Sequence, residues 1–555
     1  MRFDMTYTEK FEKWKSASFI SDKLKNELNA ITDDNEIKLR FLKDISFGTA
    51  GLRGILGPGS NCLNEVTVSW ITKGVADMIK SYGYENRGVV VGRDSRNMSD
   101  EFSRLTACVL AFNGIKVYYF DDIRPTAEVS FAVREYSAAA GVNITASHNP
   151  KKYNGYKLYW EDGAQISPEV AKKVLSFAGD EILCRVDAAD FEDAVKSGMI
   201  KLIGSETDER YLGEVNDSIG DTFDFNNELT VVYTPIHGSG YKLVPELLRR
   251  RGHNLYCVDE QMTPNGDFPT CDPPNPERKE AYTYALKKAG EVDADIILAT
   301  DPDADRQGAL VKHNGEYIML TGNQIGVFLC DYRLKNYTGD KKPYVVKSLV
   351  STDMVRPMCE DRGADLYTVL TGFKFIGEQI ALHDDEKNKF IFGFEESFGY
   401  LGKGYARDKD AVFASNCFAQ AAAIMKKEGK TVIDRLNELY LQYGGYSEKT
   451  VGFDLDPISG SEKVVKIMKE LASDIPESIC GMKVEKLTDY SKGVNGLPKS
   501  DIVEFTLSGG TKLIIRPSGT EPKVKIYALC RCETKDKADA LAPEIISAGA
   551  KLLNL

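Results

Sequence analysis

The chain has 555 residues, and at roughly 100–200 residues per domain this length predicts about three to five domains. Lys and Arg number 71 and Asp and Glu 83, giving a net charge of −12. This acidity excludes a dedicated nucleic-acid binder, which would carry a basic surface. No run approaches the roughly 20 apolar residues of a membrane span, and the first residues lack the apolar segment of a secretory signal.

Cysteine usage predicts the compartment. The 11 cysteines are scattered along the chain and form no CxxC pair, unlike those of a disulfide scaffold. We therefore expect a cytoplasmic protein. Monomer and homodimer both remain open.

Three related segments follow a helical N-terminal extension of about 45 residues. Each begins with Gly, two further residues and an apolar–Tyr pair, at Gly114, Gly252 and Gly363. Each lies between two other short, apolar, β-branched runs, and the third run always ends in polar residues. This pattern is typical of buried strands in an α/β sheet with functional residues at the strand ends.

The last hundred residues differ from the repeats. They combine a segment of helical period, several strand-like runs and a final helix near residues 535–553, which is typical of a smaller α+β domain. The fold class is therefore α/β, with three related mixed α/β domains and a smaller C-terminal α+β domain. The expected limits are 1–206, 207–324, 325–455 and 456–555.

The first polar loop is TASHNP, residues 145–150. Ser147 ends an apolar strand in a segment rich in Asn, Pro and Gly. An ordinary turn serine is one interpretation; an exposed nucleophile with His148 and Lys157 nearby is the other. The motifs GxSxG and SxxK are both absent, which argues against the hydrolases that carry them.

The second polar loop is DPDADR, residues 301–306. Asp301, Asp303 and Asp305 would share one face of an extended segment, where they would repel one another strongly without a cation. An EF-hand fits poorly, because Arg306 takes the place of its glycine. Oxygen ligands without a full cage suit Mg²⁺ with a phosphate completing its coordination.

Two later loops carry groups that suit a sugar and a phosphate. In GFEESFG, residues 393–399, Glu395 and Ser397 combine a carboxylate and a hydroxyl. In RPSGTEPK, residues 516–523, an Arg, two hydroxyls, a Gly and a Lys are typical of an anion-binding turn. Both segments are also compatible with ordinary turns that bind no ligand. Three further cations accompany the loops: Arg53, Arg407 and Lys409.

Together and in this order, the four loops resemble those of the α-D-phosphohexomutase family, phosphoglucomutase branch. The resemblance covers nearly the whole chain. It implies four domains around one central cleft, with TASHNP as the phosphoserine loop, DPDADR as the metal loop, GFEESFG as the sugar loop and RPSGTEPK as the phosphate loop. It also implies a phosphosugar substrate, and no nucleic-acid or membrane partner.

The resemblance implies a phosphoserine mechanism. Ser147 would carry a phosphoryl group, with Mg²⁺ held between that group and Asp301, Asp303 and Asp305. Transfer to the sugar phosphate would give glucose 1,6-bisphosphate as intermediate and activator, and would interconvert glucose 1-phosphate and glucose 6-phosphate.

The resemblance also assigns roles to the remaining residues. Arg53 and Arg306 would stabilise the transferring charge, and Lys409, Lys157 or His148 would transfer protons. The sugar and its second phosphate would be bound by Thr371, Gly372, Glu395, Ser397, Arg407, Arg516, Ser518, Gly519 and Thr520.

The sugar itself is less strongly specified. The sequence EESFG favours glucose over mannose within the resemblance, and FGTAGLRG with TPIHGSG resembles members that act on pentose phosphates. A phosphomannomutase, a phosphopentomutase and a glucose 1,6-bisphosphate synthase therefore remain open. A non-catalytic phosphosugar-binding protein is the alternative from a different class.

Overall fold

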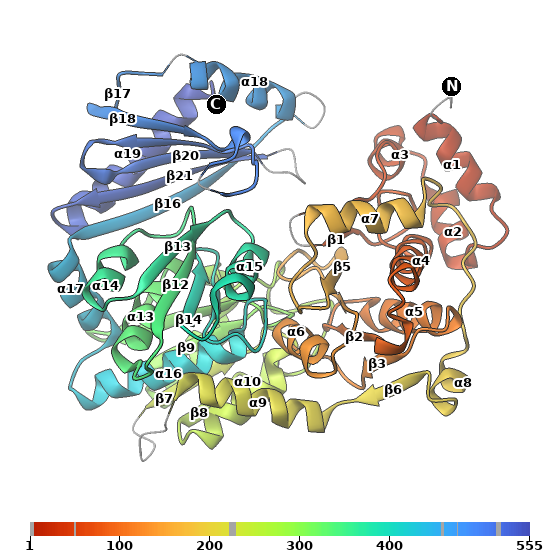
Figure 1. Cartoon of the computed structure of the whole chain (residues 1–555), viewed down its shortest axis with the longest axis horizontal. Coiled ribbons are helices and arrows are strands. Elements are labelled where there is room, and N and C mark those ends of the chain that lie inside the picture. The colour runs from red at the N-terminus through yellow and green to blue at the C-terminus, as the bar shows by residue number, and fades with distance from the viewer. Residues whose placement is uncertain are drawn as a thin grey trace. The chain divides into compact units, whose positions relative to one another are not determined.

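The computed structural model falls into two compact units. The first comprises residues 1–310 and 399–420, and the second residues 311–398 and 421–555. Figure 1 labels helices and strands of both units. The residues that the structure describes are 5–48, 51–220, 229–456, 460–473, 475–494, 496–517 and 523–555.

Three short helices form the expected N-terminal extension of the first unit. They are α1 (Tyr7–Ser16), α2 (Asp22–Ala30) and α3 (Asp34–Phe41). Thr6 and Glu9 cap the start of α1 reciprocally, which satisfies backbone N–H groups that have no partner inside the helix. The buried rings of Trp14 and Phe41 meet edge to face and join the core beneath the first sheet.

The first sheet has the order β1-β5-β4-β2-β3-β6. Strands β4, β2, β3 and β6 run parallel, and β5 is the one reversed strand, since it pairs antiparallel with β4 on one side and with β1 on the other. The strands are β1 (Leu52–Ile55), β2 (Val89–Arg93), β3 (Val117–Phe120), β4 (Ala140–Ile144), β5 (Tyr153–Trp160) and β6 (Ile200–Ile203). The helices are α4 (Glu65–Ser81), α5 (Ser99–Phe112), α6 (Thr126–Glu135), α7 (Pro168–Ala178), α8 (Phe191–Lys196) and α9 (Ser205–Ile219).

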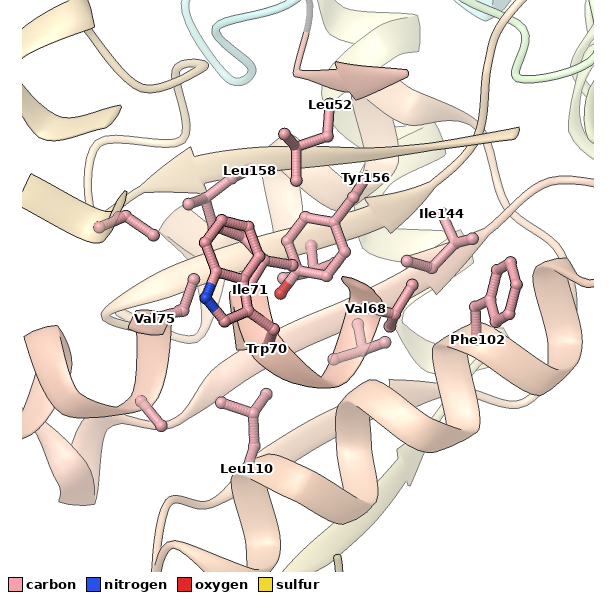
Figure 2. Packing of buried hydrophobic residues seen from close by; sticks show 14 of the residues in the cluster. Leu52, Val68, Trp70, Ile71, Val75, Phe102, Leu110, Ile144, Tyr156 and Leu158 are labelled. Carbon is pink, nitrogen blue, oxygen red and sulfur yellow. The ribbon is translucent and has the colours of Figure 1, made fainter. Parts of the chain in front are cut away.

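An apolar core lies between this sheet and its helices. Val68, Ile71 and Val75 of α4 and Leu110 of α5 point toward Tyr156 and the neighbouring strand residues (Figure 2). All five side chains are buried. Burial of such side chains is the main source of stability for the sheet.

The second repeat continues in the first unit. Its parallel strands have the order β9-β7-β8, and the chain passes into the second unit within β10. The strands are β7 (Thr230–Thr234), β8 (Asn254–Cys257), β9 (Ile296–Thr300), β10 (Gln307–His313) and β11 (Glu316–Met319). The helices are α10 (Gly240–Arg250), α11 (Asp259–Met262) and α12 (Thr283–Val292).

The third repeat has the same arrangement, with parallel strands in the order β13-β12-β14. The strands are β12 (Lys342–Ser348), β13 (Asp365–Val369), β14 (Asn388–Glu395) and β15 (Gly399–Leu401). The helices are α13 (Gly322–Asn336), α14 (Val355–Asp361), α15 (Phe373–His383), α16 (Ala411–Lys427) and α17 (Val432–Tyr443).

The three repeats therefore share one topology, as their sequence similarity predicts. In each, the first strand lies between the other two: β2 between β4 and β3, β7 between β9 and β8, and β12 between β14 and β13. The three predicted functional loops follow β4, β9 and β14. Each loop thus begins at the carboxyl end of the corresponding strand in its own sheet. In open α/β sheets, ligands bind at these carboxyl ends.

The C-terminal sheet is antiparallel, in the order β16-β21-β20-β19-β18-β17. Its elements are β16 (Gly445–Asp454), α18 (Gly460–Ser473), β17 (Ser478–Ile479), β18 (Met482–Asp489), β19 (Val503–Leu507), β20 (Lys512–Pro517), β21 (Lys523–Cys532) and α19 (Lys535–Leu552). The expected α/β fold with a C-terminal α+β part is thus confirmed. Strand β16 pairs with β21 along its whole length, so this sheet begins ahead of residue 456, where the sequence analysis started its fourth domain.

Among the described residues, no helix combines the length and apolar character needed to cross a bilayer.

Candidate functional site

Ser147 follows strand β4 in a strained turn. Its φ of 54° lies in the left-handed region, which costs a non-glycine residue on the order of 1 kcal/mol. Its backbone N–H donates to Thr145 Oγ1 at 2.8 Å. The Ser147 hydroxyl donates to Asp301 Oδ2 at 2.7 Å and lies 3.1 Å from His148 Nδ1. The turn thus directs the buried hydroxyl toward the aspartate loop.

Arg96, which the sequence analysis did not single out, holds this turn from inside. Its guanidinium has no exposed side-chain surface and donates to the carbonyl oxygens of Ser147, Asn149, Pro150 and Tyr153. The only signal in the sequence is its place just after β2, the central strand of the first repeat. Arg96 therefore positions the loop through its backbone.

Asp94 supports Arg96 in turn. Its carboxylate lies 3.5 Å from Arg96 Nε and accepts from the hydroxyl groups of Thr145 and Ser99. Burial raises the pKa of Asp94 to about 6, although Arg96 opposes the shift. The loop is thus supported by a buried charge pair beneath it.

The three aspartates of the second loop come together in a turn. Asp301, Asp303 and Asp305 are buried, and one oxygen of each lies within 4.8 Å of the others. The chain here is a turn with Ala304 at a φ of 49°, not an extended segment. The premise of one extended face is therefore wrong, although the expected convergence of the three carboxylates occurs.

The contacts of this triad fit a divalent cation. Asp301 Oδ1 accepts from the backbone N–H groups of Asp305 and Arg306, whereas Asp303 Oδ1 and Asp305 Oδ1 are buried without a hydrogen-bond partner among the described residues. Burial, then Asp303 and Asp305, raise the pKa of Asp301 well above its usual range. Three buried carboxylates with spare oxygens form a donor set for Mg²⁺.

Two lysines approach the same carboxylates. Lys157 Nζ lies 2.6 Å from Asp303 Oδ2 and 2.7 Å from Asp305 Oδ2, and Lys409 Nζ lies 3.2 Å from Asp305 Oδ2. Burial disfavours the charged form of Lys157, but the two aspartates outweigh it and raise its pKa. The structure thus brings Ser147, the aspartates and both candidate lysines together.

Helix α6 connects to the aspartate loop at its first residue. The hydroxyl of Thr126 donates to Asp303 Oδ2 at 2.8 Å and accepts from Asn143 Nδ2 at 2.9 Å. Its backbone N–H also donates to the carbonyl oxygen of Asp303. Thr126 is a second residue that the sequence analysis missed, since a threonine at a helix start reads as an ordinary cap.

The predicted arginines also lie near the two loops. Arg53 donates to Asn149 Oδ1 at 3.2 Å. Arg306 forms an ion pair with Glu277. Burial, then Arg306 and Arg53, hold the pKa of His148 well below its usual range, so His148 is a neutral hydrogen-bonding partner of Ser147.

The segment of residues 406–410 carries Arg407 and Lys409. Arg407 is buried and its backbone N–H donates to Ser130 Oγ at 2.9 Å. Asp408 contacts Lys409 Nζ at 3.1 Å and accepts from the side chains of Tyr159 and Gln165. Asp408 therefore holds Lys409 beside the aspartate loop.

In the second unit, the loop after β14 meets the loop before α15. Gly372, directly after Thr371, donates its backbone N–H to Glu395 Oε1 at 2.7 Å. Ser397 lies in the turn after β14. Glu396, which the sequence analysis passed over, accepts from the hydroxyl of Ser348 at 3.0 Å.

The predicted phosphate loop is described only at its ends. Arg516 lies near the end of β20 opposite Lys525 of β21. Ser518, Gly519 and Thr520 lie outside the described residues. The anion-binding role of this loop stays a prediction.

Comparisons with known proteins agree with this arrangement. Four phosphoglucomutase/phosphomannomutase family models match: the three alpha/beta/alpha domains at residues 44–181, 209–315 and 321–443, and the C-terminal domain at residues 471–548. A phosphoglucomutase of Staphylococcus epidermidis is 35% identical over 517 residues, covering 90% of this chain and 93% of its own. One of Staphylococcus saprophyticus is 34% identical over 534 residues, covering 93% and 96%.

Solved structures share the fold. A putative phosphomannomutase from Thermus thermophilus superposes with a TM-score of 0.69 at 20% identity, covering 92% of this chain and all of that one. Parafusin, a phosphoglucomutase from Paramecium, gives a TM-score of 0.71 at 17% identity, covering 92% and 96%. On its four matched domains and its full-length relatives, this chain belongs to the phosphoglucomutase/phosphomannomutase family.

Proposed function

We propose that the chain is a Mg²⁺-dependent phosphoglucomutase that interconverts glucose 1-phosphate and glucose 6-phosphate through a phosphoserine at Ser147 and a glucose 1,6-bisphosphate intermediate. The observation that carries the proposal is the 2.7 Å hydrogen bond from the Ser147 hydroxyl to Asp301 within the buried aspartate triad. The full-length relatives named phosphoglucomutase support the reaction and the sugar.

Asp301, Asp303 and Asp305, with a phosphoryl oxygen on Ser147, would hold the Mg²⁺. The ion would supply charge neutralisation for the phosphoryl group. The spare buried oxygens of Asp303 and Asp305 support this assignment. Lys157 and Lys409 would then share these carboxylates with the ion and add positive charge next to the transferring group.

The transfer itself is a balanced exchange of P–O bonds. The bond from phosphorus to Ser147 Oγ breaks, and a bond from phosphorus to a sugar hydroxyl oxygen forms. The hydroxyl proton goes to a nearby base, and Lys409, Lys157 and His148 are the candidates for these proton transfers, with Lys157 as the proton donor because its pKa is raised. Return of the other phosphate to Ser147 from the bisphosphate completes the cycle. Arg53 and Arg306 would stabilise the developing negative charge.

Residues of the second unit would hold the sugar and its distal phosphate. Glu395 and Ser397, with Thr371 and Gly372, offer a carboxylate, hydroxyls and a backbone amide, and the hydrogen bond from Gly372 to Glu395 supports their acting together. Arg407 of the first unit and the turn Arg516, Ser518, Gly519 and Thr520 would bind phosphate. The limits expected for the first two domains belong to the same proposal, whereas strand β16 goes with the fourth domain because it pairs with β21.

We place the enzyme in the cytoplasm. The cysteines that the structure describes are free thiols, which agrees with a reducing compartment.

A coupled assay in parallel on glucose 1-phosphate, mannose 1-phosphate and ribose 1-phosphate tests the substrate. We expect the highest kcat/KM for glucose 1-phosphate. Equal or higher kcat/KM for either competitor would replace glucose by that sugar.

The variant Ser147→Ala tests the mechanism. We expect it to lose nearly all turnover, together with the phosphoryl mass on the intact protein. Ser103→Ala, which alters a buried serine of α5 that bonds Tyr119, is the matched control and should keep both. Turnover near that of the native chain in Ser147→Ala would rule out the phosphoserine.

A further inference from the structure

A cavity of about 210 Å³ lies within the second unit, and among the described residues its lining includes none of the site residues discussed above. One wall comes from the third repeat, at Leu349 after β12, Arg356 of α14 and Thr368 of β13. The other wall comes from strands β18, β19 and β20 of the C-terminal sheet and the segment after β18. The volume has room for roughly seven water molecules at ~30 Å³ each.

The two walls are joined by an apolar cluster that includes two of the lining residues, Leu349 and Tyr490. A buried cluster joins Leu349 and Leu370 to Tyr490 and Ile514 of the C-terminal part. Asp353, just before α14, adds an ion pair at 2.8 Å to Lys512 of β20. Apolar and ionic contacts therefore hold the two walls of the cavity together.

Its rim is cationic. Arg356 and Lys486 line the cavity and are exposed, and among the described residues neither has a carboxylate within ion-pair distance. Lys512 also lines the cavity, but its charge is paired with Asp353, and Glu504 is the only acidic lining residue among those described. In a chain of net charge −12, this local excess of cations favours an anionic ligand.

Its floor offers hydroxyl groups and an acceptor. The hydroxyl of Thr368 is buried without a hydrogen-bond partner among the described residues, and the buried Thr488 lies on the same lining. Glu504 accepts from the Tyr490 hydroxyl at 3.1 Å and lies 3.8 Å from Lys512, which offsets its charge. Such a floor suits hydroxyl groups on a ligand, because an unpaired buried polar group is costly.

From this division between rim and floor, we propose that the cavity is a second, non-catalytic site for a small hydroxylated phosphate ester of about three carbons. The phosphate lies between Arg356 and Lys486, and the hydroxyl groups of the ester reach Thr368 and Glu504. The site is separate from the predicted phosphate loop. Lys512 begins the strand that carries Arg516, four residues further on, or about 13 Å at ~3.3 Å per residue.

Calorimetric titration of the full chain with glycerol 3-phosphate tests the site. The double variant Arg356→Gln/Lys486→Gln removes both rim charges and should weaken the binding of glycerol 3-phosphate at least tenfold. The reason is that hydrogen bonds from charged groups to a phosphate are stronger than those from neutral groups. The matched control Arg362→Gln/Lys483→Gln removes two exposed charges outside the lining, one at the opposite end of α14 and one on the same strand β18, and should bind as the native chain does.

A second variant leaves the charges in place. Val494→Phe fills the cavity from its lining and should abolish the binding sterically. Inorganic phosphate should bind more weakly than the ester, and glycerol alone should not bind measurably. Because the probe is bound at equilibrium without turnover, the result does not depend on which sugar the enzyme converts.

Two outcomes would overturn the proposal. One is equal affinity for glycerol 3-phosphate in the native chain and in both cavity variants, which would assign all binding to another site. The other is equal affinity for phosphate and for the ester, which would remove the role of the floor. Both cavity variants should keep the native kcat/KM for glucose 1-phosphate when the ester is absent.

Discussion

Arg96 positions Ser147 without touching its hydroxyl. One guanidinium donates to four consecutive or near-consecutive carbonyl oxygens of the loop, and Phe268 covers its face at 5.0 Å. A turn with a left-handed serine is costly on its own, so these bonds stabilise a conformation that the local sequence disfavours. Removal of them should release the serine from its place beside Asp301.

We therefore predict that Arg96→Lys lowers kcat on the order of 100-fold while the chain stays folded, because an ammonium cannot span four carbonyl groups and small misplacements of a reacting atom cost about this much. Steady-state kinetics and the phosphoryl mass on Ser147 measure the effect. Arg104→Lys, which alters only an exposed arginine with surface ion pairs, is the control. Native kcat in Arg96→Lys would show that the loop holds its shape unaided.

The loops at the ends of the third strands share a further property. Each contains a non-glycine residue in the left-handed region: Ser147 after β4, Ala304 after β9 and Phe398 after β14. Such residues persist only where the surroundings hold them. At the scale of elements, the three related sheets therefore carry three strained turns, and residues outside the turns hold the first two: Arg96 after β2 and Thr126 of α6.

Helix α6 holds the aspartate loop in place through the hydrogen bond from Thr126 to Asp303. We predict that Thr126→Val weakens Mg²⁺ binding by about 10–100-fold, the usual cost of losing a hydrogen bond to a metal ligand, because Asp303 loses its hydroxyl donor. Titration of metal-stripped protein with Mg²⁺, followed by activity and by calorimetry, measures it.

Thr126→Ser restores the hydroxyl and is the matched control, so its Mg²⁺ affinity should return to within a few-fold of the native value. Equal affinities in Thr126→Val and the native chain would remove the connection between α6 and the metal loop.

Strand β16 contains an ionisable group in an unfavourable setting. Burial raises the pKa of Glu448 to about 7 from 4.5, although Thr352, Lys535 and Lys347 oppose the shift. Between these values the folded chain binds more protons than the unfolded chain, so stability falls as the pH rises. The destabilisation caused by the ionised, buried Glu448 carboxylate is absent below pH 4.5 and fully present above pH 7.

Glu448→Gln should therefore be more stable than the native chain at pH 8, by about 3 kcal/mol, and nearly equal to it near pH 4.5. Melting temperatures at the two pH values test this. Glu485→Gln, on the exposed face of β18, should show no such dependence. A constant difference across the pH range would exclude titration of Glu448 as the cause.

At the scale of the whole molecule, the strand repeat was predictable because buried parallel strands are short, apolar and bounded by turn residues. Because the third strand of each repeat ends in polar residues, the order of the polar loops was predictable from the strand repeat. Ser147 and the three aspartates were therefore predictable as candidate site residues. Arg96, Thr126 and Glu396 were not predictable, since their roles depend on contacts across repeats or between strand ends. The sequence also did not reveal that β16 pairs with β21, because strand pairing between distant segments leaves no local pattern.

The N-terminal helices provide the last test at this scale. Trp14 is 2% exposed, and its ring centroid lies 5.8 Å from that of Phe41. Both residues belong to the core beneath the first sheet. Trp14→Ala should cost about 3–5 kcal/mol and lower the melting temperature, while kcat at 25 °C stays native because, among the described residues, Trp14 packs within the apolar core. Phe19→Ala, which alters a ring that is 40% exposed, should change stability by less than about 0.5 kcal/mol. A melting temperature in Trp14→Ala equal to that of Phe19→Ala would show that the extension does not stabilise the first sheet.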